Sequence, residues 1–103
     1  MADYTIIVTQ RAFVDVTECV SFVRNVSVEA AKQLYDEIIC SINSLMTLPN
    51  KYPEIDGLTI GGSKVRKMPI HQGRYVALYK AESHTITIYD ILDVRKDSFL
   101  NKI

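Results

Sequence analysis

The sequence predicts a single α+β domain in which a helical hairpin covers one face of a mostly antiparallel sheet. Two observations predict this fold class. Apolar residues recur at three- and four-residue steps over two consecutive segments of the first half, which is typical of helices. One segment before these helices and three segments after them are rich in β-branched and aromatic residues, which favours strands. A strand, two helices and then three strands pack best as one helical layer on one sheet.

The first half supplies the first strand and both helices. Residues 4–9 favour a short strand, and Thr9 is suited to cap a helix of about four turns. The apolar positions of this helix are Phe13, Val16, Cys19 or Val20, and Val23. Ser27 is suited to cap a second helix, whose apolar stripe is Ala31, Leu34, Tyr35, Ile38, Ile42 and Leu45. Pro49 ends this helix, because the residue before a proline is pushed out of the α region.

The second half predicts an antiparallel meander. Residues 48–63 contain prolines and glycines, and we expect either a functional loop or a short extra element there. Strands are expected at residues 64–70, 75–81 and 84–91, with joins short enough for hairpins. Val76, Leu78, Ile86 and Ile88 are expected to face the helices, and Tyr75, Tyr79, Thr85, Thr87 and Tyr89 to face away. From Asp93 onward we expect a frayed helix or a tail.

Composition limits the classes of protein that the chain can belong to. Residues 1–103 are of a size that forms one domain. The start lacks a basic region, and no apolar run is long enough to cross a membrane, so neither a signal peptide nor a membrane span is expected. Cys19 and Cys40 have no CxxC spacing and fit a reducing cytosol, where we expect both to be small buried residues. Because no metal-ligand spacing or phosphate-binding loop is present, no metal or cofactor is expected.

A net charge of zero hides a strong asymmetry along the chain. Residues 1–60 hold four Lys/Arg against eight Asp/Glu, and residues 61–103 hold eight against four. The candidate target-binding residues are six of the eight cations of the second half, Lys64, Arg66, Lys67, Arg74, Arg95 and Lys96. Brought together by the sheet, they could bind phosphates or an acidic partner. Alternatively, they line solvated strand edges and discourage pairing between sheets.

Several segments, in their order and spacing, resemble the RelE/ParE superfamily of toxins from type II toxin–antitoxin and plasmid-stabilisation modules. They are residues 30–31, 42–45, 48–49, 65–69, 73–79 and 86–97, and the resemblance runs from Tyr4 to about Asp97, nearly the whole chain. It implies a cytoplasmic toxin that a cognate antitoxin neutralises by folding over apolar side chains of the toxin. A homodimer and a toxin–antitoxin hetero-oligomer both remain open.

The superfamily divides into two mechanisms. RelE-like members cut mRNA on the ribosome, and the resemblance then implies Arg66 and Arg95 as catalytic residues, with Lys67 or Arg74. ParE-like members inhibit DNA gyrase by binding. Val76 stands where RelE-like chains carry an arginine, and the tyrosine expected beyond the final arginine is missing, with Phe99 and Asn101 near its place. The resemblance is therefore closer to the ParE-like branch, with a RelE-like endonuclease or a degenerate toxin that only binds its antitoxin as alternatives.

Overall fold

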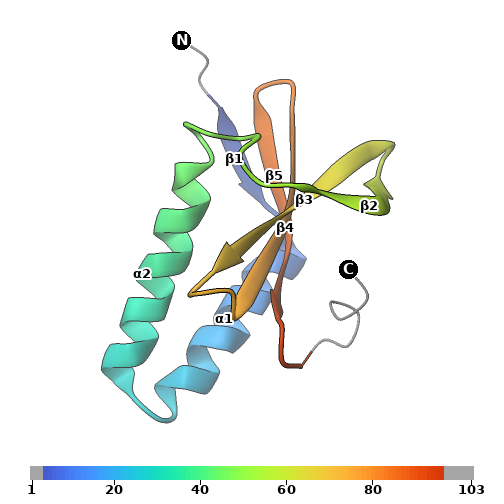
Figure 1. Ribbon diagram of the computed structural model, residues 1–103. Coiled ribbons are helices and arrows are strands. Elements are labelled where there is room, and N and C mark those ends of the chain that lie inside the picture. Colours follow the sequence, from blue (N-terminus) through green and yellow to red (C-terminus); the bar gives the residue numbers. More distant parts are fainter. Residues whose placement is uncertain (1–3, 97–103) are drawn as a thin grey trace.

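Residues 4–96, which the computed structural model describes, form two helices and a five-stranded sheet. The elements are β1 (Thr5–Val8), α1 (Gln10–Arg24), α2 (Val28–Ser44), β2 (Glu54–Ile60), β3 (Ser63–Ile70), β4 (Tyr75–Glu82) and β5 (Thr85–Asp93). The strand order is β1-β5-β4-β3-β2, in which β1 runs parallel to β5 and the other neighbours are antiparallel. Figure 1 shows the two helices as a hairpin on one side of the sheet. The α+β class and the helical layer are as the sequence predicts.

Both predicted helix caps are confirmed. The Thr9 hydroxyl accepts a hydrogen bond from the backbone N–H of Ala12 at 3.1 Å, and it donates one to the carbonyl of Tyr89 at 3.0 Å. The Ser27 hydroxyl accepts from the N–H of Ala30 at 3.1 Å. Thr9 therefore caps α1 and also holds the N-terminus of this helix against β5.

The meander has four strands, since residues 48–63 contain the additional strand β2. This strand pairs with β3 through Glu54 opposite Arg66 and Thr59 opposite Lys64, with an irregular register between the two pairs. Gly57, at φ +78°, lies in the irregular stretch, in the left-handed region that glycine adopts most readily. Of the two alternatives expected for residues 48–63, the extra element is therefore present, whereas the prediction of a three-stranded meander is wrong. The bulge interrupts the alternation of apolar and polar residues from which a strand would be predicted.

The face that β4 turns toward the helices differs from the prediction. Ser83 and His84 both have positive φ and form a two-residue turn, which places Ala81 opposite Ile86 and Tyr79 opposite Ile88. Next to this turn, odd-numbered residues of β4 therefore share a face with even-numbered residues of β5, and a register shift between Leu78 and Tyr79 then places Ala77 opposite Ile91. The expected placement of Ile86 and Ile88 is correct, whereas Tyr75 and Tyr79 lie in the core beneath the helices instead of Val76 and Leu78.

The main core lies between the helical hairpin and the sheet, and a smaller cluster occupies the opposite face. The main core includes Leu34, Ile38 and Tyr79, and the smaller cluster consists of Ile55, Val65 and Leu78 with partly buried neighbours. Cys19 packs against the main core as expected, but Cys40 lies on the exposed side of α2, so the prediction that it is buried is wrong.

Beyond β5, residues 94–96 form a turn, and the expected tail, with Phe99 and Asn101, lies outside the described residues. Neither α1 nor α2 has the length and apolar character that crossing a bilayer requires.

Candidate functional site

The sheet separates the six candidate cations instead of gathering them. Three of them, Lys64, Arg66 and Lys67, lie on β3, and the other three follow β3 or β5. The backbone N–H of Val94 donates to the carbonyl of Arg74 at 3.0 Å, which brings the chain after β5 beside the β3–β4 turn. Arg74, Arg95 and Lys96 thus lie at one end of the sheet, and we call these three residues the basic end.

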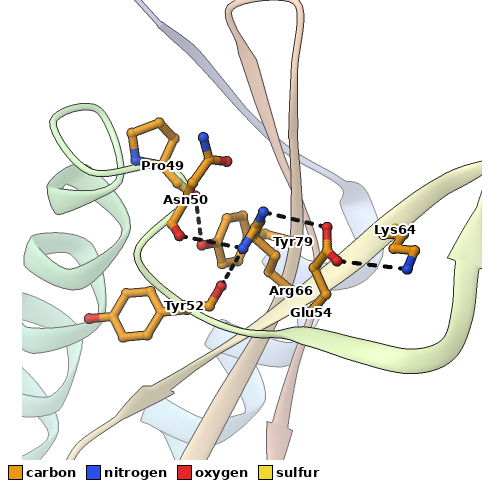
Figure 2. Close-up of polar contacts among 7 residues, drawn as sticks. All are labelled: Pro49, Asn50, Tyr52, Glu54, Lys64, Arg66 and Tyr79. Carbon is orange, nitrogen blue, oxygen red and sulfur yellow. Dashed lines mark hydrogen bonds and ion pairs between the residues drawn. The ribbon is translucent and has the colours of Figure 1, made fainter.

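Arg66 holds the segment that leads from α2 to β2 against the sheet. Its guanidinium donates from Nη1 to the carbonyl of Tyr52 at 2.6 Å and to that of Asn50 at 3.4 Å, and its Nη2 lies 3.4 Å from a carboxylate oxygen of Glu54. Figure 2 shows these contacts converging on one guanidinium. The side chain is only 21% exposed. We call Arg66 with these three partners the Arg66 clasp.

Tyr79 lies beside the Arg66 clasp, where its hydroxyl is used structurally. The hydroxyl donates to the carbonyl of Pro49 at 2.8 Å, and the side chain is fully buried (Figure 2). Burial raises the pKa of Tyr79 to about 12, although the charge of Arg66 acts in the opposite direction. A phenol with this pKa does not ionise near neutral pH, so it is poorly suited to general base catalysis.

The remaining cations of β3 lie on opposite faces of the sheet. Lys64 shares the helix-facing side with Arg66, and its ammonium lies 3.8 Å from the Glu54 carboxylate with 65% of the side chain exposed. Lys67 lies opposite Leu78 and faces away from the helices. A single ligand that lies on one face of the sheet therefore cannot contact all three.

Within the basic end, the three cations differ in how much of each side chain is available. Arg95 is 58% exposed, and its Nε lies 3.8 Å from the Asp93 carboxylate, which also accepts a hydrogen bond from the Arg95 backbone N–H at 2.9 Å. The Lys96 ammonium lies 4.3 Å from the centre of the Phe22 ring, within cation–π range. The Arg74 guanidinium lies 5.8 Å from the centre of the Tyr75 ring. Arg95 is therefore the cation of this end that is best placed to meet a large partner.

An acidic pocket of about 290 Å³ lies between the middle of α1 and β5, and it was not predicted from the sequence. Its lining includes Asp15, Glu18, Cys19, Asp90 and Asp93. Asp15 accepts a hydrogen bond from the backbone N–H of Ile91 at 3.0 Å, yet burial and the nearby Asp90 raise its pKa. Burial likewise raises the pKa of the Cys19 thiol to about 11, so this thiol is unreactive as a nucleophile.

The outer side of the helical hairpin carries an apolar groove of about 410 Å³. Its lining residues, which we call the hairpin groove, are Val8, Phe13, Val16, Thr17, Val20, Ser21, Tyr35, Ile39 and Ile42. Phe13 is 64% exposed and Tyr35 48% exposed, although the sequence places both on stripes that were expected to be buried. The sequence does contain a sign of this exposed apolar surface. Apolar residues such as Val14 and Phe22 occupy more of α1 than one buried face requires.

The two histidines lie in turns of the sheet and contact side chains of other elements. His71, in the β3–β4 turn, lies with Nδ1 3.1 Å from the Glu37 carboxylate of α2. His84, in the β4–β5 turn, packs its ring against that of Tyr4 at 5.5 Å between centroids. Over residues 4–96, no three His, Cys, Asp or Glu side chains converge in a way that could hold a metal ion.

Comparisons with known proteins assign the chain to a family. The family model that describes the ParE toxin of the type II toxin–antitoxin system parDE matches residues 6–98, and the chain therefore belongs to the ParE toxin family. A solved structure described as the chromosomal ParDE TA system from P. aeruginosa contains a similar chain, with a TM-score of 0.71 and 18% identity. The match covers 91% of this chain and 99% of that one, and at this identity it shows a shared fold. No curated protein matches the sequence.

Proposed function

We propose that the chain is a cytoplasmic toxin that stops growth by binding an essential protein, DNA gyrase, and that a cognate antitoxin neutralises it. Membership of the ParE toxin family supports the toxin and antitoxin parts of this proposal. The choice of a binding mechanism over mRNA cleavage rests on the chemistry of the individual side chains.

The observation that carries the choice is the structural use of Arg66 and Tyr79. Cleavage of RNA needs a group that activates the 2′-hydroxyl and a cation at the scissile phosphate. Arg66 already donates to the Tyr52 carbonyl, and the Tyr79 hydroxyl is buried against Pro49. A substrate could reach either group only if residues 49–54 left the sheet, which favours a toxin that acts by binding.

The basic end is the proposed contact with gyrase, with Arg95 as its main residue. Arg95 is exposed, and Asp93 accepts a hydrogen bond from its backbone N–H, which fixes the backbone from which the side chain extends toward an acidic surface. Lys64 and Lys67 lie elsewhere on the sheet and are proposed to contribute only to the long-range attraction of an anionic partner.

The hairpin groove is the proposed antitoxin-binding surface. Type II antitoxins are proteins, and a groove lined by aliphatic and aromatic side chains fits the apolar face of an amphipathic segment. A bound antitoxin would bury Phe13 and Tyr35, which the free chain exposes. Without it, two toxin chains are expected to associate through the same groove.

The experiment is expression of the chain in growing bacteria, with and without the antitoxin encoded beside it, while incorporation of labelled thymidine and methionine is followed. Gyrase inhibition stops DNA synthesis before protein synthesis, and co-expression of the antitoxin restores both. An early collapse of methionine incorporation with continued DNA synthesis would contradict the proposal. Arg95→Gln is expected to relieve inhibition, whereas Lys80→Gln, the same change of charge on β4, is expected to retain it.

A further inference from the structure

A second cleft lies on the other side of α2, between that helix and the β3–β4 turn. It has a volume of about 220 Å³, and its lining residues, which we call the Arg74 cleft, are Val23, Ala30, Gln33, Leu34, Glu37, His71, Arg74 and Tyr75. Figure 1 shows the turn between β3 and β4 lying beside the helical hairpin. The cleft thus belongs to three elements that the core holds in fixed relative positions.

Arg74 is the residue of this cleft whose donors are not all used, because its side chain contacts Tyr75 but leaves one N–H group without an acceptor. Its Nε–H is buried and has no hydrogen-bond acceptor among residues 4–96. The Tyr75 ring, 5.8 Å from the guanidinium carbon, holds the side chain in place. Buried N–H groups of folded proteins are nearly always hydrogen-bonded, and a charged one without a partner is especially unfavourable. The cleft therefore contains a charged donor that residues 4–96 leave unused.

The other residues of the cleft indicate which chemical group could accept a hydrogen bond from the Arg74 Nε–H. The missing group must accept a hydrogen bond and balance a positive charge, as a carboxylate does when it pairs with arginine. One wall offers the Gln33 amide as a second donor, and Val23, Ala30 and Leu34 form an apolar wall that suits the methylene groups of an acidic side chain. Glu37 is already engaged by His71 at 3.1 Å and so is not the acceptor that Arg74 lacks.

A nucleic-acid phosphate fits these surroundings less well. The backbone of a nucleic acid brings a row of negative charges, and the Glu37 carboxylate on the wall of the cleft would repel them. A single carboxylate on a short apolar stem meets less of this repulsion and fills a small cleft better.

We propose that the Arg74 cleft binds an Asp or Glu side chain of a protein partner, with the carboxylate on the Arg74 guanidinium and the stem on the apolar wall. Arg74 then acts as a recognition residue for one acidic side chain, separately from the exposed Arg95. This assignment goes beyond the proposed function, since it does not depend on which protein the toxin inhibits.

The test is titration of the ¹⁵N-labelled full chain with the blocked pentapeptide Ac-Ala-Leu-Glu-Leu-Ala-NH2, with its glutamine analogue as the neutral probe. The N–H signal of Arg74 Nε, assigned by its loss in Arg74→Gln, and the Gln33 side-chain amide are followed by NMR. Both signals should shift in a saturable way with the glutamate peptide and stay in place with the glutamine peptide. In Arg74→Gln, the Gln33 response should be lost. Arg24→Gln is the matched control, because it removes the same charge from an exposed site next to the cleft and should leave the response unchanged.

Three results would overturn the proposal: equal shifts with both peptides, equal loss of response in Arg24→Gln and Arg74→Gln, or a stronger response to inorganic phosphate than to the glutamate peptide. Should Arg74→Gln fail to fold, Arg74→Lys serves in its place. Lysine keeps the charge but lacks the planar fork of donors, so the response should weaken about fivefold. An unchanged response in Arg74→Lys would also contradict the proposal.

Discussion

Replacing Arg66 by alanine is expected to destabilise the folded protein by about 2–3 kcal/mol, because the Arg66 clasp holds residues 49–54 against the sheet. The substitution removes the donors to Asn50 and Tyr52 and the partner of Glu54. It leaves two backbone carbonyls short of a hydrogen bond at the point where the chain enters β2. The edge strand should therefore loosen together with the segment before it.

The magnitude follows from the geometry of the three contacts. The bond to the Tyr52 carbonyl, at 2.6 Å, is short and charge-assisted, and such bonds contribute about 1.5–3 kcal/mol. The contact with Glu54, at 3.4 Å, involves a carboxylate that is 42% exposed, and such pairs contribute about 0–1 kcal/mol. The bond to the Asn50 carbonyl, also at 3.4 Å, is long and adds little. For a domain of this size, the sum corresponds to a fall in Tm of roughly 10–20 °C.

The assay is thermal unfolding by circular dichroism, with chemical denaturation to give the free energy of unfolding. Lys64→Ala is the matched control, since Lys64 lies 3.8 Å from the same Glu54 carboxylate but is 65% exposed. Its loss should change stability by about 0.5 kcal/mol or less. The loss of stability in Arg66→Lys should lie between the losses in Arg66→Ala and Lys64→Ala, because lysine keeps the positive charge but lacks the planar set of N–H donors. Equal Tm values for Arg66→Ala and Lys64→Ala would refute the reasoning.

Three further outcomes are expected. Asp15→Asn should stabilise the protein near pH 7, because the raised pKa of Asp15 means that its ionised form destabilises the folded state. In urea titrations this gain should vanish as the pH falls below the ordinary pKa of 3.8. Phe13→Ser, in the hairpin groove, should reduce self-association of the free chain in light scattering, whereas Val26→Ser, in the α1–α2 turn, should not. Thr9→Ala should lower the free energy of unfolding by about 2 kcal/mol and Ser27→Ala by about 1, since only Thr9 also bonds to β5. Equal losses for the two cap variants, or unchanged association in Phe13→Ser, would contradict these accounts.

Local signals predicted most of the fold, because caps and apolar stripes depend on neighbours in the sequence. Thr9 and Ser27 could be identified as caps since the hydrogen bonds that they accept come from residues three positions away. For residues 48–63 the sequence left a loop and an extra element as alternatives and did not identify β2 as a strand, because the bulge at Gly57 breaks the alternation on which strand prediction relies. The face of β4 was assigned wrongly because it depends on the two-residue turn at Ser83 and His84, which sets the parity of the pairing.

The candidate site was predicted less completely, since it depends on contacts between distant segments. The clustering of cations in the second half of the sequence suggested that Arg66 and Arg95 form one binding surface. In the structure, the Arg66 clasp instead joins β3 to the segment before β2. The side-chain partners of a cation are not encoded by its neighbours along the chain. Arg74 and Arg95 do come together, because β4 begins where β5 ends.

The most direct test of the central claim, a toxin that binds gyrase and does not cut RNA, uses one preparation of the protein in two reactions. One reaction measures supercoiling of a relaxed plasmid by purified gyrase, and the other measures the integrity of a reporter mRNA in a translating extract. We expect supercoiling to be inhibited, with release by the antitoxin, and the mRNA to remain intact. Discrete cuts in the mRNA on ribosomes, with supercoiling unaffected at micromolar protein, would contradict the account.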